Sequence, residues 1–114
     1  MDDRAVDAEV FQALQDSTGA EFVRELVATF LEELPAMVAQ LAAALRGGDV
    51  ETFRRTAHSL KSNSLTFGAS ALAAMARELE LAAGPIVKGE RAAQLDALAA
   101  EEARVASALR ALAR

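Results

Sequence analysis

The stretch that decides the fold covers residues 54–69 and reads RRTAHSLKSNSLTFGA. On a helical wheel at about 100° per residue, one face, which we expect to be the core face, collects Val50, Phe53, Ala57, Leu60, Ser64 and Phe67. His58, the only histidine of the chain, lies roughly 120–140° from the centre of that face. The stretch therefore predicts an amphipathic helix over 49–67 with an imidazole that points outward from its middle.

The helical neighbours of His58, three and four residues away, are Arg54, Arg55, Lys61 and Ser62. The first three of these side chains are cationic. Cations beside an imidazole disfavour its protonation and would stabilise the oxygens of a phosphoryl group, while the small Ser62 leaves room for that group. Each charge taken singly is better explained as an ordinary solvated side chain, and a lone exposed histidine can be inert. The joint pattern favours an anion site.

Apolar residues elsewhere recur at three- and four-residue spacing and predict four further helical segments. A short N-terminal helix with Val6, Val10, Phe11 and Leu14 would cover one end of the molecule. The other three segments lie at 20–45, 69–83 and the C-terminal end. Their inward residues are Phe22, Leu26, Phe30, Leu34, Met37, Leu41 and Leu45; Leu72, Met75, Ala76 and Leu79; and Leu95, Leu98, Val105, Leu109 and Leu112.

Breaks separate these segments at residues 16–19, 47–48, 68 and 84–85. Thr18 with Glu21 has the spacing of a capping box, and Asp49 and Ser70 are placed to cap the helices that follow them. Pro35 removes one backbone donor, so we expect a kink or a split within 20–45. Long amphipathic helices joined by short loops predict an all-α, up-down-up-down four-helix bundle with a short additional N-terminal helix, in one domain over 1–114.

Composition excludes several classes of function. The net charge is −5, which argues against nucleic-acid binding, and the chain has no cysteine for disulfides or thiolate metal sites. We also expect no metal site around a single histidine. The acidic N-terminus is unlike a signal peptide, and no apolar run approaches the about 18 residues of a membrane span. These features predict a cytoplasmic protein that does not bind membranes.

The run from Ala57 to Ala69 resembles the signature of the histidine-containing phosphotransfer family. That signature has the form Ala-His-x-Leu-Lys-[Gly/Ser]-x-[Ser/Ala], with Gly-Ala a few residues later. The flanks at 31–35, 48–49 and 77–80 resemble the family too, so the likeness extends from about Phe22 to Glu80. The chain departs from the commonest pattern at Ser62, where the family often has glycine.

The resemblance implies that His58 accepts a phosphoryl group from a receiver-domain aspartate and passes it to another receiver, and that Lys61 orients or neutralises that group. Gly68 would close the helix and let the next one pack tightly. Partners would be response-regulator receivers and a sensor or hybrid histidine kinase, with Mg²⁺ on the receiver and no cofactor on this chain. Leu65 is the candidate docking residue, although a partly buried edge position explains it equally well. We expect a monomeric carrier, not an enzyme.

Two rival functions remain open at this point. One is a helical interaction module whose His58 is never phosphorylated. The other is a hydrolase that uses His58 as a base with Ser59 or Ser62, although no orienting acid or oxyanion-hole turn is recognisable. The sequence names neither donor nor acceptor, nor the direction of transfer.

Overall fold

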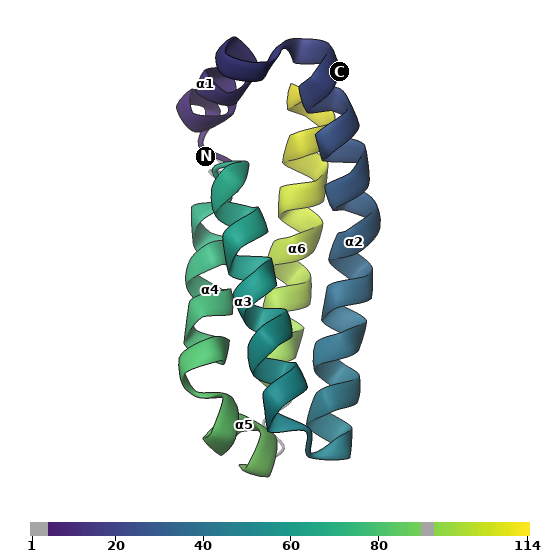
Figure 1. Cartoon of the computed structure of the whole chain (residues 1–114), viewed down its shortest axis with the longest axis vertical. Helices are drawn as coiled ribbons and strands as arrows, with labels where there is room; N and C mark the ends of the chain where they lie inside the picture. Colours follow the sequence, from purple (N-terminus) through teal and green to yellow (C-terminus); the bar gives the residue numbers. More distant parts are fainter. Residues whose placement is uncertain (1–4, 90–92) are drawn as a thin grey trace.

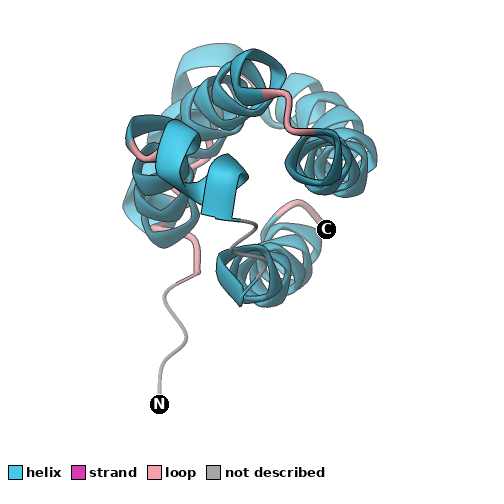
Figure 2. Cartoon of the chain, turned by 90° about the horizontal axis from the view of Figure 1, so that it is seen from below, coloured by secondary structure: helices cyan, strands magenta, loops and turns pink. Residues whose placement is uncertain are grey.

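A computed structural model describes residues 5–89 and 93–114, and within these ranges the secondary structure is helical throughout (Figure 1). Four long helices follow the long axis: α2 (Ala20–Gly47), α3 (Val50–Thr66), α4 (Ser70–Leu81) and α6 (Ala93–Leu112). Each runs opposite to the one before it in Figure 1. Seen along that axis, they surround a common centre, with α2 against α3 and α6, and α4 against α3 and α6 (Figure 2). The sequence therefore predicted the helical class correctly.

Two short helices lie at opposite ends of the molecule. At one end, α1 (Ala8–Thr18) crosses the top in Figure 1 and places Phe11 in the core at 2% exposure. At the other end, α5 (Ala83–Gly89) follows α4. The expected N-terminal helix is confirmed. The expected stop at Gly84-Pro85 is wrong, because both residues lie in the first turn of α5, where proline loses no intrahelical hydrogen bond.

The helix ends confirm one predicted cap and contradict two. Asp49 caps α3, and Thr52 donates to it from its backbone at 3.1 Å and from its hydroxyl at 2.7 Å. These two bonds are the main reason that the pKa of Asp49 lies below its ordinary value. The expected Thr18 cap is wrong, because that hydroxyl donates to the carbonyl of Leu14 at 2.8 Å and Gly19 precedes α2 without a side-chain cap. Ser70 is the first residue of α4 and not its cap.

Helix α2 is continuous from Ala20 to Gly47, so Pro35 does not split it. Its buried stripe begins with Val23 and Val27. Phe22 is 49% exposed, so its predicted place in the core is wrong. By length and composition alone α2 could also cross a membrane, which the sequence analysis did not anticipate. Its apolar stripe instead packs against α3 and α6.

Candidate functional site

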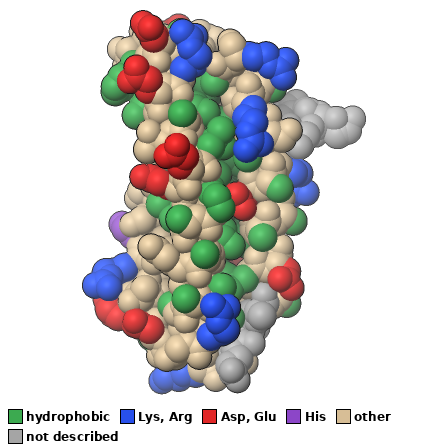
Figure 3. Space-filling model, turned by 90° about the vertical axis from the view of Figure 1, so that its right-hand side faces the viewer, with side chains coloured by type: hydrophobic (Ala, Val, Ile, Leu, Met, Phe, Trp, Pro, Cys, Tyr) green, Lys and Arg blue, Asp and Glu red, His purple; other side chains and the backbone are tan. Residues whose placement is uncertain are grey.

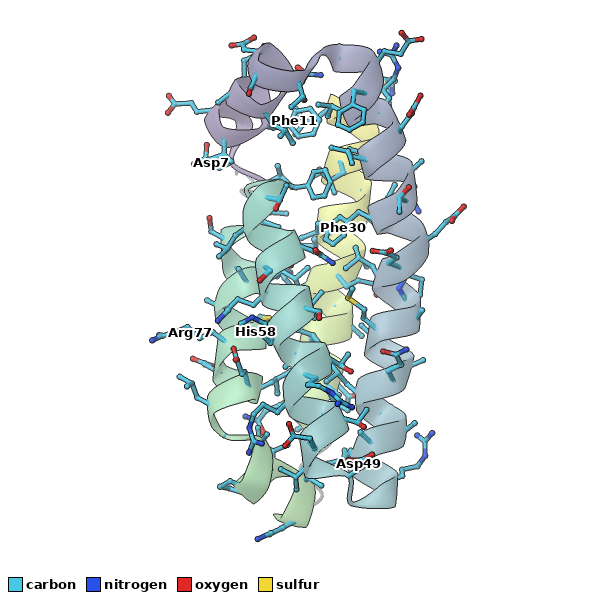
Figure 4. The ribbon with its side chains drawn as sticks, in the orientation of Figure 1. Asp7, Phe11, Phe30, Asp49, His58 and Arg77 are labelled. Carbon is cyan, nitrogen blue, oxygen red and sulfur yellow. The ribbon has the colours of Figure 1, made fainter. Side chains whose placement is uncertain are left out.

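His58 stands in the middle of α3 with its side chain 57% exposed. Phe53, Ala57 and Leu60 of the same helix are completely buried. The spacing of these residues turns one face of α3 into the core and leaves His58 on the opposite side, where Figure 4 labels it. The predicted outward orientation of the imidazole is confirmed.

A carboxylate that the sequence analysis did not assign to the site completes it. Glu80, near the end of α4, places Oε2 2.8 Å from Nδ1 of His58. Its other oxygen, Oε1, lies 3.0 Å from Nζ of Lys61. One carboxylate therefore contacts the imidazole and the ammonium, which lie three residues apart on α3. Glu80 falls inside the flank 77–80 that carried the family resemblance, but only the packing of α4 on α3 shows that it reaches His58.

The electrostatics of this cluster differ from the purely cationic surroundings predicted from the sequence. Lys61 first, and the ring of His58 second, hold the pKa of Glu80 below its ordinary value. The side chains of Glu80 and Lys61 are only 20% and 24% exposed, so their ion pair is partly shielded from water. The carboxylate thus stays ionised near neutral pH while it is hydrogen-bonded to His58 and ion-paired with Lys61.

The contact with Glu80 also settles which ring nitrogen of His58 faces outward. An ionised carboxylate only accepts hydrogen bonds, so Nδ1 carries the proton that it shares with Glu80. In the neutral form of the ring, Nε2 is then the nitrogen that carries the lone pair. Across residues 5–89 and 93–114, no side chain bonds to Nε2. With the ring neutral, the site presents a nucleophilic nitrogen on a side chain that is 57% exposed.

The two arginines expected beside His58 pair elsewhere. Nη1 of Arg54 lies 3.0 Å from a carboxylate oxygen of Glu51, and Arg55 donates to the hydroxyl of Thr52 at 3.5 Å. Both turn toward the N-terminal end of α3, and of the three predicted cations only Lys61 shares a partner with His58. Ser62 is exposed.

Gly68 follows α3 with a φ of +78°, a region that disfavours any residue with a Cβ. A Cβ at this position would lie 2.9 Å from Cβ of Val10 and 3.0 Å from the carbonyl oxygen of Asp7. The Asp7 amide also donates to the Gly68 carbonyl at 2.8 Å. The close approach at this position therefore involves the N-terminal segment, which the sequence analysis did not anticipate.

Leu65 lies two turns beyond His58 on α3 and is 56% exposed, so the partly buried edge position considered for it is wrong. It borders a shallow depression of about 200 Å³ between α3 and α4. The other residues that line this depression are Lys61, Ser70, Ala73, Ala74 and Arg77. Among the residues that the structure describes, no group of three His, Cys, Asp or Glu side chains is placed to hold a metal ion.

The family model of the Hpt domain matches the chain over residues 25–114, a range that includes His58, Lys61 and Glu80. The chain belongs to the Hpt family. A crystal structure of histidine-containing phosphotransfer protein B (HptB) from Pseudomonas aeruginosa PAO1 is similar to this chain, with a TM-score of 0.87 and 30% sequence identity. The alignment covers 98% of this chain and 96% of HptB. No match was found among curated proteins.

Membership in the Hpt family gives the chain its role. It is a histidine phosphotransfer domain of a two-component phosphorelay, in which Hpt proteins work with kinases and receiver domains. Proteins of this family generally act as phosphoryl carriers. The small fold that it shares with HptB suggests a soluble protein.

Proposed function

We propose that His58 is the residue that carries the phosphoryl group, which it accepts from a receiver aspartate and passes to another receiver. The observation that carries this assignment is the hydrogen bond of 2.8 Å between Nδ1 of His58 and Glu80. Because that bond occupies Nδ1, the exposed Nε2 keeps its lone pair and faces a partner. His58 is also the only histidine available in the chain.

The transfer proceeds in line between a nitrogen and an oxygen. The lone pair of Nε2 forms the N–P bond as the P–O bond to the receiver aspartate breaks, and that bond's electron pair returns to the aspartate carboxylate. The ring of His58 gains positive charge, which the Glu80 carboxylate stabilises through Nδ1–H. Return to the second receiver reverses these changes. Positioning of the two reactants and stabilisation of the phosphoryl charge supply most of the rate, because the loose transition state leaves the protein little covalent chemistry to do.

Glu80 and Lys61 assist this transfer in different ways. Glu80 is a positioning residue, since it fixes the tautomer and the ring orientation of His58. Lys61 lies one turn from His58, where its ammonium stabilises the phosphoryl oxygens. The phosphoryl group competes with Glu80 for Lys61, so the carboxylate also limits how strongly the phosphorylated state is held. Arg54 and Arg55 contribute only a general positive field, Ser62 leaves room for the phosphoryl group, and Gly68 acts through the backbone conformation that it allows.

The remaining assignments extend the same proposal. The four long helices form an up-down-up-down bundle, and residues 1–114 make one domain that works as a monomer in the cytoplasm. The chain acts as a carrier without turnover chemistry of its own. Its donor is a sensor or hybrid kinase system, and the receivers hold the Mg²⁺ that phosphoryl transfer uses. Among the residues that the structure describes, Glu80 is the carboxylate in contact with His58, and its pairing with Lys61 supports a metal ion on the receiver rather than beside His58.

Replacement of the histidine tests the central assignment. We expect His58→Gln to fold normally, because the ring is largely exposed and glutamine can still hydrogen-bond to Glu80. The variant should show no acid-labile phosphorylation when mixed with a phosphorylated receiver, as measured by radiolabel on a denaturing gel. Labelling at the wild-type level would remove His58 from the role and leave the unphosphorylated interaction module as the better hypothesis.

Replacement of the lysine tests the stabilisation of the phosphoryl group. We expect Lys61→Ala to slow transfer about tenfold, which is less than the about 10² seen for fully preorganised donors, because water reaches part of this ammonium. Rapid-quench measurement of transfer from a phosphorylated receiver gives the rate. Lys88→Ala, an exposed cation on α5, is the matched control and should transfer as the wild type does. Equal rates in both variants would contradict the role of Lys61.

A further inference from the structure

The hydrogen bond to Glu80 decides on which side of His58 a phosphoryl group would lie. Nδ1 of the ring faces Glu80 on α4 at 2.8 Å. The two ring nitrogens bond in diverging directions, so Nε2 faces away from α4. In Figure 3, which views the molecule from the side of α2, the imidazole is visible in purple at the edge of the surface. The side of the ring away from α4 is therefore open, and a phosphoryl group on Nε2 would occupy it.

The two flanks of α3 carry different neighbours of His58. Lys61 lines the depression between α3 and α4, and Arg55 lines the hollow between α2 and α3. At about 100° per residue, Lys61 lies roughly 60° from His58 around the helix toward α4, whereas Ser62 lies roughly 40° away in the opposite direction. Ser62 therefore shares the flank of Arg55, toward which Nε2 is turned.

The hydroxyl of Ser62 is placed to reach that side of the ring. Residues four apart on a helix have Cβ atoms about 5–6 Å apart, and helical side chains lean toward the N-terminus, so Ser62 leans toward His58. Ser62 is exposed, and across residues 5–89 and 93–114 its hydroxyl has no hydrogen-bond partner. The hydroxyl of Thr66, on the same helix, instead donates to the carbonyl oxygen four residues earlier. The Ser62 hydroxyl is thus free to donate to a group bound at His58.

The cationic side chains next to the ring already have partners. Nζ of Lys61 lies 3.0 Å from Oε1 of Glu80, on the α4 flank. Arg55 shares the flank of Ser62, but its guanidinium donates to the hydroxyl of Thr52, toward the N-terminal end of α3. Of Lys61, Arg55 and Ser62, the serine alone combines the flank of Nε2 with a donor that has no partner in the described part of the chain.

We propose that the Ser62 hydroxyl donates a hydrogen bond to an oxygen of the phosphoryl group on Nε2 of His58 and so stabilises the phosphorylated state. This inference rests on the proposed function and adds a second phosphoryl ligand to it. Lys61 acts on the phosphoryl oxygens from the α4 flank, and Ser62 binds one of them from the α2 flank. A hydrogen bond to an anionic oxygen is stronger than one between neutral groups. The glycine that the family often has at this position offers no such donor.

Removal of the hydroxyl tests this assignment. The probe is the receiver domain of the same organism that, phosphorylated with acetyl phosphate, labels the wild-type protein fastest. Rapid-quench measurements in both directions give the ratio of the rate constants for transfer to and from His58. We expect Ser62→Ala to lower this ratio about fivefold, as the loss of one hydrogen bond at an exposed site implies. Ser62→Thr keeps the hydroxyl and should restore the ratio.

Two controls separate the hydrogen bond from a structural effect. Ser59→Ala removes another exposed hydroxyl of α3, but adjacent residues on a helix do not face each other, so the ratio should stay at the wild-type value. The urea midpoint of Ser62→Ala should not fall, because alanine is the better helix former. The receiver concentration that gives half the maximal rate should also stay unchanged, since the hydroxyl contacts the phosphoryl group and not the receiver.

The outcomes distinguish this inference from the proposed function. If no receiver places an acid-labile label on His58, the proposed function itself is overturned. If His58 is labelled but Ser62→Ala keeps the wild-type ratio, only the role of Ser62 is overturned. The same holds if Ser62→Ala changes the half-saturating receiver concentration and not the ratio, because Ser62 would then be a docking contact. A loss in Arg55→Gln that is absent in Ser62→Ala would assign the bond to the guanidinium and overturn the inference.

Discussion

At the scale of single residues, the site depends on one carboxylate that contacts two side chains, the imidazole of His58 and the ammonium of Lys61. Glu80 binds Lys61 and His58 from a different helix, so its substitution loosens the contact between α3 and α4 as well as the imidazole. A group with a lowered pKa in the folded state stabilises that state when it is ionised. Its contribution is present above its ordinary pKa of 4.5 and is lost as the pH falls through the lower folded value.

This sign leads to a prediction for Glu80→Gln. We expect the variant to unfold at a lower urea concentration than the wild type at pH 7, and the difference to shrink as the pH is lowered below about 4. Urea titrations followed by circular dichroism at both pH values measure it. A gap between the two proteins that stays constant with pH would show that the ionised carboxylate contributes nothing. Asp49→Asn offers a comparison, because Asp49 also has a lowered pKa but lies far from His58.

The sequence could predict the outward position of His58 but not the presence of Glu80. A helical wheel places residues of one helix relative to one another, and His58 and Lys61 belong to the same helix. Glu80 is 22 positions from His58, and its contact depends on how α4 rotates against α3. The sequence also could not predict the partners of the two arginines. Whether Arg54 pairs with Glu51 and Arg55 with Thr52 depends on side-chain rotamers, which residue spacing does not determine.

At the scale of helices and turns, sequence patterns predicted the long elements and erred at their ends. Asp49 was predicted correctly because its cap uses residues within three positions. The prediction that Thr18 caps α2 was wrong because its hydroxyl can hydrogen-bond within the preceding helix as well as at the start of the following one. It donates to the carbonyl of Leu14 in α1. Helix α5 was missed because a Gly-Pro pair is typical of turns, although proline also fits the first turn of a helix.

The turn after α3 allows a matched comparison of two glycines. Gly48 and Gly68 both have positive φ, but only at Gly68 would a Cβ meet other atoms within 4 Å. We expect Gly48→Ala to cost about 1 to 2 kcal/mol from backbone strain alone. Gly68→Ala should cost at least about 1 kcal/mol more, because the methyl group overlaps Val10 and Asp7. Equal losses in chemical denaturation would contradict a tight contact between this turn and the N-terminal segment.

At the scale of the whole molecule, the apolar residues form one cluster that extends from Ala5 to Leu109 and includes residues of all the helices the structure describes. The short helix α1 joins it through Phe11, and the backbone bond from Asp7 to Gly68 ties the N-terminal segment to the turn between α3 and α4. A shared core of this kind couples α1 to the helix that carries His58, so we expect residues 1–114 to unfold as one unit.

Phe11→Ala tests this coupling directly. Loss of a fully buried phenylalanine costs about 3 kcal/mol or more, and in a single cooperative unit the midpoint for the whole chain must fall. We expect one calorimetric transition at a lower temperature, coincident with the loss of helix by circular dichroism, with calorimetric and van't Hoff enthalpies still equal. If α1 instead unfolded alone, a small early loss of helix would precede a main transition at the wild-type midpoint. That result would place α1 outside the cooperative domain and leave the other helices to position His58 without it.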